Sequence, residues 1–519
     1  MKQVQLYDTT LRDGAQGEGV SFSLEDKIRV VQKLDALGIH YIEGGWPGSN
    51  PKDAQFFKKI QKIALKNSQI TAFGSTRRAG EKAEKDNNIK HLLKANTEIV
   101  TIFGKSWDFQ VSDILKADLD ENLRMIFDSV IYLKKQGRRV FYDAEHFFDG
   151  FRANRDYALK TLLAAQDGGA DCIILCETNG GMLSSEVRKI VSYVKTRIKI
   201  PLGIHTHNDS GMAVSNTIAA VEEGCTQVQG TINGYGERCG NADLCVIIPN
   251  LKLKLNIDCI SDENLKKLSE TAHYIAEIAN MVPCDNQPFV GKSAFAHKGG
   301  VHIDGVVKNA KSYEQIDPAL VGNRRRFLLS ELSGKTNILV KAKELNLDLA
   351  KKDPQTKKIL ELLQNLENQG YQFEAAESSF ELLMNKALGR YKDFFKLEGF
   401  SIVIEKKGKR ITSKASVRVK VKETEKESTA CGDGPVNALD KALRKVLTDF
   451  YPVLAEMHLS DFKVRVLDAK EGTAAKVRVL IQSQDKKDTW SSVGVSENII
   501  EASWQALRDS MEYKLWKEK

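Results

Sequence analysis

The chain has 519 residues, of which 42% are hydrophobic and 28% charged. This length exceeds what one ordinary core holds, so we expect one large domain and one or two smaller ones. The net charge of +8 comes from basic and acidic residues mixed along the chain, which argues against nucleic-acid binding and suits small anionic substrates. No apolar run approaches the roughly 20 residues that span a bilayer, which argues against a membrane protein.

The N-terminus and the cysteines indicate a cytoplasmic protein. A strand-like segment begins directly after Met1 and leaves no room for a signal peptide. The eight cysteines are scattered and no CxxC motif is present, so we expect reduced thiols and neither a disulfide framework nor a thiolate zinc site.

Up to about Asn250, short apolar or β-branched runs alternate with stretches of helical period. Eight such βα units within about 250 residues match the size of a (β/α)8 TIM barrel. A doubly wound sheet is the alternative, but no GxGxxG motif follows the first run and polar clusters follow many runs. We therefore predict an α/β fold with a TIM barrel. The predicted strands are Val4–Thr9, His40–Trp46, Ile70–Ser75, Glu98–Phe103, Arg139–Ala144, Cys172–Glu177, Leu202–Thr206 and Gln227–Ile232.

After the eighth unit the pattern becomes helical, and from about Phe395 a period of two returns. We predict a TIM-barrel catalytic domain at 1–260, helical linker subdomains at 261–394 and an α+β domain with a weak internal repeat at 395–519. The predicted helices are Asp262–Ala279, Ser330–Leu345, Thr356–Asn368, Glu374–Leu388, Val436–Asp449 and Ile499–Lys514. The predicted later strands are Phe400–Lys406, Ala415–Val421, Leu459–Leu467 and Ala475–Ser483.

Two histidines at the end of the seventh predicted strand give the strongest local signal. His205 and His207 are residues i and i+2 of a strand, so both imidazoles point to the same face. At the C-terminal end of a barrel strand this face is the barrel mouth, where TIM-barrel active sites lie. A pair of hydrogen-bonded surface histidines is the alternative, since HxH sequences are common.

A polar turn containing Arg12 and Asp13 follows the first predicted strand. A solvated turn would explain it, because Asp-Gly favours turns. If the barrel closes, however, strands one and seven open onto the same face, and Asp13 can add an oxygen ligand to the histidine pair. Two histidines and one carboxylate form a catalytic metal site whose open positions can chelate substrate oxygens. Arg12 offers a fixed positive charge for a developing oxyanion.

Three motifs together resemble the DRE-TIM metallolyase superfamily. They are LYDTTLRDGAQ at 6–16, HTHND at 205–209 and GYGERCGNA at 234–242. That superfamily includes 2-isopropylmalate, homocitrate and citramalate synthases, 3-hydroxy-3-methylglutaryl-CoA lyase and carboxyltransferase domains. The part after 395, with its Gly-Asp-Gly-Pro turn, resembles the LeuA-like allosteric domain of the isopropylmalate and citramalate branch, so the resemblance covers essentially the whole chain.

The resemblance implies a metal site. Asp13, His205, His207 and Asn241 match the ligands of a divalent ion, and the mixed nitrogen and oxygen set suits Mn²⁺, Mg²⁺ or Zn²⁺. Asn241 enters only through the resemblance, because its spacing alone does not single it out.

The resemblance also assigns the substrate-handling residues. Arg12 matches a residue that stabilises enolate or alkoxide charge, Thr178 one that contacts the oxo-acid carboxylate, and Glu145 one that helps to place acetyl-CoA. His302 and Tyr313 match residues that reach over the barrel of the partner subunit in a homodimer and take part in proton abstraction. Without the resemblance, His302 would be a structural loop histidine.

The segments EGGWPGSNPKD at 43–53 and YDAEHFFDG at 142–150 resemble the citramalate synthase subgroup. This implies a Claisen-type condensation of acetyl-CoA with pyruvate, followed by thioester hydrolysis to (R)-citramalate and CoA, in isoleucine biosynthesis. Because pyruvate ends in a methyl, bulky Tyr142 and Trp46 could shrink the acid pocket, although ordinary strand core would also explain them. The alternative activity is 2-isopropylmalate synthase, with 2-oxoisovalerate as substrate and leucine as effector.

The C-terminal domain is interpreted as regulatory, with isoleucine as the expected inhibitor. A dimerisation module without a ligand is the alternative. A second alternative for the whole chain is a metal and amino-acid sensor that has lost catalysis, since a fold does not guarantee a function.

Overall fold

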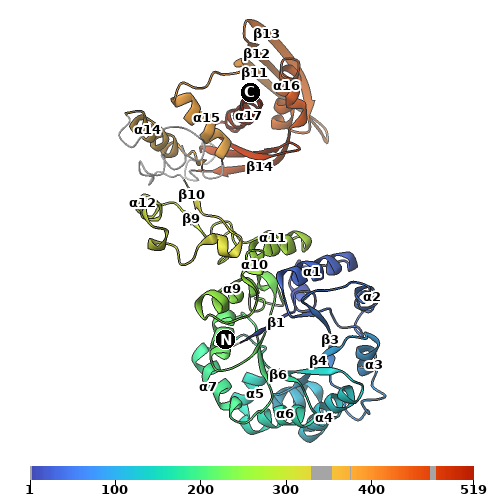
Figure 1. The fold of residues 1–519 in the computed structure, drawn as a ribbon. Coiled ribbons are helices and arrows are strands. Elements are labelled where there is room, and N and C mark those ends of the chain that lie inside the picture. Colours follow the sequence, from blue (N-terminus) through green and yellow to red (C-terminus); the bar gives the residue numbers. More distant parts are fainter. Residues whose placement is uncertain (1–2, 329–353, 374–375, 468–474) are drawn as a thin grey trace. The chain divides into compact units, whose positions relative to one another are not determined.

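The computed structural model describes residues 3–328, 354–373, 376–467 and 475–519. The chain divides into two compact units (Figure 1). The first comprises Met1–Phe295 and Ile316–Arg324, and the second comprises Ala296–Gln315 and Arg325–Lys519. The domain boundaries expected from the sequence, near 260 and 394, stay a prediction.

The first unit is a closed barrel of eight parallel strands in sequence order, which confirms the predicted TIM barrel and excludes a doubly wound sheet. Closure is made by β1, which pairs with both β2 and β8. The carboxyl ends of all eight strands therefore open onto one face. The strands are β1 Gln5–Asp8, β2 Tyr41–Glu43, β3 Gln69–Ser75, β4 Ile99–Lys105, β5 Arg139–Glu145, β6 Cys172–Glu177, β7 Leu202–Thr206 and β8 Gln227–Gly230.

Helices surround the barrel and bury one apolar side against the outer face of the strands (Figure 1). The first of them begins at a capping box in which Ser23 and Asp26 satisfy each other's backbone N–H groups, and it buries Val30, Val31 and Leu34. The helices are α1 Leu24–Leu37, α2 Pro51–Ile60, α3 Asn87–Lys94, α4 Leu119–Lys135, α5 Phe147–Ala153, α6 Arg155–Asp167, α7 Ser184–Lys195, α8 Ala213–Glu222 and α9 Leu244–Pro249.

Side chains that alternate with those of the helix-facing core fill the inside of the barrel. Tyr7, Tyr41 and Phe141 pack together there. The Tyr7 hydroxyl donates to Glu43 at 2.9 Å and lies 2.7 Å from Thr71 Oγ1. The barrel interior is thus a packed core in which the Tyr7 hydroxyl is hydrogen-bonded to its neighbours, and it supports the groups at the mouth.

The helix predicted at Asp262–Ala279 is two helices, α10 Asp262–Leu265 and α11 Leu268–Ile278. The break falls at Lys266, where the backbone of Gly322 approaches the Lys266 carbonyl so closely that a side chain at 322 would collide with it. The loop that contains Gly322 therefore packs against the break between the two helices.

The second unit begins with the short strands β9 Ala296–His297 and β10 Arg326–Phe327 and the helix α12 Gly300–Lys308. The predicted helices at Thr356–Asn368 and Glu374–Leu388 correspond to α14 Pro354–Asn368 and α15 Glu377–Ala387. The helix predicted at Ser330–Leu345 lies outside the described residues.

The C-terminal part repeats one pattern twice, three antiparallel strands followed by a helix, which confirms the predicted repeat. The third strand of each sheet was not predicted, because neither has a clear alternation of apolar residues. None of the described helices is long and apolar enough to cross a membrane. The elements are β11 Lys396–Lys407, β12 Arg410–Val421, β13 Thr424–Gly432, α16 Pro435–Thr448, β14 His458–Val466, β15 Val477–Gln484, β16 Thr489–Ser496 and α17 Ile499–Lys517.

Candidate active site

Asp13, His205 and His207 meet at the mouth of the barrel. One potential ligand atom from each lies within 4.8 Å of the others, and all three side chains are buried. His205 is inside β7, His207 follows its end, and Asp13 closes the turn after β1, in which the N–H groups of Arg12 and Asp13 both donate to the Thr9 carbonyl. The i, i+2 spacing at the end of β7 therefore places the two histidines on one face, and closure of the barrel brings Asp13 beside them.

Two further atoms at this place are buried without a hydrogen-bond partner among the described residues. They are Nδ1 of His207 and Oδ1 of Asn241. Asn241 lies opposite His207 in a β-bridge, and its amide donates to the Tyr235 carbonyl at 3.2 Å. A buried polar atom without a hydrogen-bond partner is energetically costly. These two unpaired atoms are therefore suited to bind a cation, together with Asp13 and His205.

The protonation of the three groups also suits a cation. Burial, together with the neighbouring His205, lowers the pKa of His207 to about 4. Burial lowers the pKa of His205 as well. Burial alone would raise the pKa of Asp13, but Arg12 and the two histidines hold it below its ordinary value. At neutral pH the site therefore offers two neutral imidazoles and one carboxylate.

Arg12 is fixed beside this cluster by three contacts. Its Nε donates to Glu43 Oε1 at 2.6 Å, its Nη1 lies 3.4 Å from Asp13 Oδ2, and its guanidinium lies 3.9 Å above the Phe73 ring. Burial raises the pKa of Glu43, and Arg12 acts against this increase. Arg12 is thus a preorganised positive charge that faces the cavity.

The cavity at the mouth has a volume of about 250 Å³. It is lined by Arg12, Asp13, Thr178, His205 and His207 together with Glu145, which pairs with Lys105. The Thr178 hydroxyl accepts from the His146 N–H at 2.9 Å and keeps its own proton for a ligand. His146 is a non-glycine residue with a positive φ of 58° beside Glu145, the kind of backbone strain that clusters at functional sites.

An aromatic wall of Trp46, Phe73 and Phe103 forms part of the cavity lining. The Trp46 ring meets Phe73 and Phe103 edge-on with centroids 5.9 and 5.7 Å apart, and its Nε1 donates to Asn88 at 2.7 Å. Tyr142 does not reach the cavity. It is fully buried in the core between strands and helices, on the opposite face of β5 from Asp143 and Glu145.

His302 and Tyr313 lie in the second unit, where their rings stack with centroids 4.2 Å apart. Gly305 makes room for the stack, since a Cβ there would come within 2.6 Å of the Tyr313 ring. The next residue, Glu314, anchors the turn by accepting from Arg325 Nε at 2.6 Å and by contacting His297 Nε2 at 3.0 Å. Tyr313 is 44% exposed, so the pair is available at the surface of its unit.

The charged residues Glu43, Asp143, Glu237 and Arg238 line the cavity or support it but were not singled out from the sequence. Glu43 and Asp143 are the last and third-last residues of β2 and β5, and both point inward. Glu237 and Arg238 lie in the loop after β8, and Arg238 is held by Asp209 at 2.8 Å. Glu43 could have been found as the histidines were, because it is a polar residue at the C-terminal end of a barrel strand.

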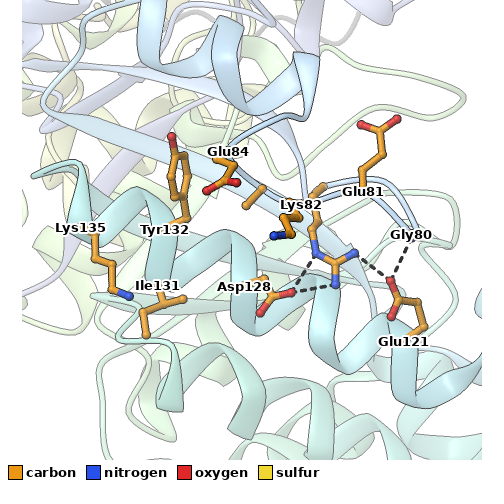
Figure 2. Close-up of a pocket in the computed structure, with 11 residues that line it drawn as sticks. Gly80, Glu81, Lys82, Glu84, Glu121, Asp128, Ile131, Tyr132 and Lys135 are labelled. Carbon is orange, nitrogen blue, oxygen red and sulfur yellow. Dashed lines mark hydrogen bonds and ion pairs between the residues drawn. The ribbon is translucent and has the colours of Figure 1, made fainter.

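A second cavity, of about 460 Å³, lies beside α4 and contains none of the predicted site residues. Figure 2 shows Glu121 and Asp128 pointing toward one guanidinium, that of Arg77, which bonds to both at 2.8 Å. Arg77 is 4% exposed and is engaged by carboxylates of the chain itself. We assign this cluster the structural role of tying the loop after β3 to α4.

The fold and the mouth of the barrel define a class: a TIM barrel with a buried site of two histidines and one carboxylate beside a fixed arginine, as in metal-dependent enzymes. The comparisons with known proteins agree with this class. Residues 3–275 match the HMGL-like family, 289–371 the homocitrate synthase post-HMGL domain-like family and 374–515 the LeuA allosteric (dimerisation) domain. This chain belongs to the HMGL-like family.

Several curated proteins are similar over the whole length. An (R)-citramalate synthase of Geobacter sulfurreducens is 57% identical over 100% of this chain and 98% of its own, and one of Aquifex aeolicus is 55% identical over the same shares. A 2-isopropylmalate synthase of Methanocaldococcus jannaschii is 31% identical over 98% of this chain and 94% of its own.

Proposed function

We propose that this chain is an acyltransferase that condenses acetyl-CoA with pyruvate and hydrolyses the thioester to give (R)-citramalate and CoA. One observation carries the proposal. Five relatives named (R)-citramalate synthase are 45–57% identical over 98–100% of the chain, whereas a 2-isopropylmalate synthase and a probable 2-isopropylmalate synthase are each 31% identical and a putative (R)-citramalate synthase is 30% identical.

Asp13, His205, His207 and Asn241 are the residues proposed to hold a divalent ion, whose identity among Mn²⁺, Mg²⁺ and Zn²⁺ is left to experiment. The unpaired atoms of His207 and Asn241 support this assignment. When bound, such an ion supplies a Lewis acid that polarises the oxo acid and orients its oxygens.

The chain's own residues supply the rest of the chemistry. Thr178 donates a hydrogen bond from its hydroxyl to the carboxylate of pyruvate, which orients the oxo carbon in the cavity. Arg12, fixed by Glu43, stabilises the negative charge that develops on the carbonyl oxygen as the new carbon–carbon bond forms. Water then cleaves the thioester and releases CoA.

The acetyl methyl must lose a proton before it can attack, and thioester methyls are weak carbon acids, so the base must be positioned. Glu145 lines the cavity and is proposed to place acetyl-CoA. His302 and Tyr313 are proposed to take part in the proton transfer. Their stacking and exposure are compatible with this role, and the resemblance to the superfamily suggests it.

The C-terminal part is proposed to be the regulatory and dimerisation domain, with isoleucine as inhibitor. In β14, Phe462, Val464 and Val466 are 36%, 41% and 52% exposed, although they pair with Ile481, Val479 and Val477 on the core face of the sheet. An apolar sheet face left open suits a second copy of the chain. Light scattering should give the mass of a dimer, and Val464→Lys should shift it toward the monomer.

The activity is tested by CoA release from acetyl-CoA with pyruvate or 2-oxoisovalerate, each with and without isoleucine or leucine. Release with pyruvate that isoleucine inhibits supports the proposal. Preference for 2-oxoisovalerate with inhibition by leucine would indicate 2-isopropylmalate synthase. Release with neither acid, while a metal still binds, would indicate a non-catalytic sensor.

A further inference from the structure

A buried glutamine, Gln229, connects His205 of the site to a second carboxylate, that of Asp143, on the other side of the barrel. Gln229 Oε1 lies 3.0 Å from His205 Nδ1, and Gln229 Nε2 donates to Asp143 Oδ1 at 3.1 Å. The three side chains come from β7, β8 and β5, and their residues are 6%, 0% and 4% exposed. We call this chain of hydrogen bonds the histidine relay.

The relay has a direction. The amide of Gln229 lies with its NH₂ toward Asp143 on β5 and its carbonyl toward His205, which is the arrangement that an ionised Asp143 requires, because a carboxylate only accepts hydrogen bonds. The carbonyl also only accepts, so the proton of the neutral imidazole must be on Nδ1. Nε2 then carries the free lone pair, and Nε2 is the atom that lies 3.4 Å from Asp13 Oδ2.

The reverse direction is incompatible with metal binding. If Asp143 donated to the glutamine carbonyl, the amide would donate to Nδ1 and the imidazole proton would be on Nε2. Nε2 of His205 would then be protonated and could not donate a lone pair to a cation next to Asp13. An ion at the site and a carboxylate acceptor at Asp143 therefore favour the same arrangement.

We propose that Gln229 and Asp143 are positioning residues that fix the tautomer and the ring orientation of His205, so that Nε2 is presented as a metal ligand. This proposal rests on the metal-dependent function proposed above and extends it to two residues that do not themselves bind the ion. Partners of this kind change metal affinity by about 10- to 100-fold when they are removed.

Gln227 provides a matched control on the same strand. It is two residues before Gln229, points to the same side of β8 and is 1% exposed. Neither its amide oxygen nor its amide nitrogen has a hydrogen-bond partner among the described residues. Replacing either glutamine by methionine removes the same polar atoms at nearly the same length, but only one replacement breaks the relay.

The test is a titration of the metal-stripped full-length chain with Co²⁺, followed by visible absorption. We expect Gln229→Met to raise the Kd about 10- to 100-fold and Gln227→Met to leave it within about threefold of the wild-type value. The double variant Asp143→Asn/Gln229→Glu should also stay within about threefold, because the new carboxylate accepts from Nδ1 and the new amide donates to that carboxylate.

Equal Kd values for Gln229→Met and Gln227→Met, or a double variant as weak as Gln229→Met, would overturn the relay while the metal site stands. A wild-type chain that does not bind Co²⁺ would overturn the metal site and the relay together. If Gln229→Met does not fold, the ¹⁵N signals of His205 in the wild-type chain decide, assigned by their loss in His205→Gln. A proton on Nδ1 supports the relay, and a proton on Nε2 overturns it.

Discussion

Replacement of Trp46 by leucine should widen the choice of oxo acid. Trp46 lines the cavity edge-on to Phe73 and Phe103, so loss of the indole opens space against two apolar rings. A pocket that excludes one methylene discriminates by about 1–3 kcal/mol. Removing that exclusion should raise kcat/KM for 2-oxobutyrate relative to pyruvate about 10- to 100-fold.

The assay is CoA release with each acid as the varied substrate, and Tyr142→Leu is the matched control. Tyr142 is another bulky aromatic residue of the same barrel, but it is buried on the helix side of β5. Tyr142→Leu should leave the ratio within about twofold and lower the free energy of unfolding by about 2 kcal/mol. An unchanged ratio in Trp46→Leu, or a change as large in Tyr142→Leu, would refute this account of the aromatic wall.

Three further predictions concern charge. Arg12→Lys keeps the charge but loses the Nε–H that donates to Glu43, so kcat should fall about 100-fold. Turnover within about threefold of wild type would contradict this role. Lys27 Nζ and the Asp53 carboxylate form a buried ion pair. Lys27→Met removes the cation and should lower the free energy of unfolding, measured in urea, by about 3–5 kcal/mol. A decrease below about 1 kcal/mol would contradict this prediction. Burial raises the pKa of Glu177 to about 7. Between its unfolded value near 4.5 and about pH 7, Glu177 is protonated in the folded chain and ionised in the unfolded chain, so the free energy of unfolding falls as the pH rises. Glu177→Gln should remove that part of the pH dependence of unfolding, and an unchanged pH profile would exclude Glu177 as its source.

The barrel could be predicted because each of its units carries a clear switch from strand to helix period. The third strands of the two C-terminal sheets could not. β13 reads Thr-Glu-Lys-Glu-Ser-Thr over its first six residues, and such an exposed edge strand has no apolar face to reveal it.

Those site residues could be predicted whose positions follow from the alternation of side chains along one strand and from closure of the barrel. His205 and His207 share a face by spacing, and barrel closure adds Asp13. Tyr142 and Glu145 are three residues apart on one strand and therefore point to opposite faces, so the cavity that contains Glu145 excludes Tyr142. The contacts of Gln229 cross the barrel interior from β8 to β7 and β5, and no local pattern predicts such contacts.

We propose that the chain condenses pyruvate with acetyl-CoA at the site formed by Asp13, His205 and His207. The most direct measurement is CoA release with pyruvate before chelation, after chelation and after Mn²⁺ is restored, with His207→Ala assayed in parallel. We predict release that chelation abolishes and Mn²⁺ restores, with (R)-citramalate as product and no restoration in His207→Ala. Release that persists after chelation, or that His207→Ala retains, would contradict the account.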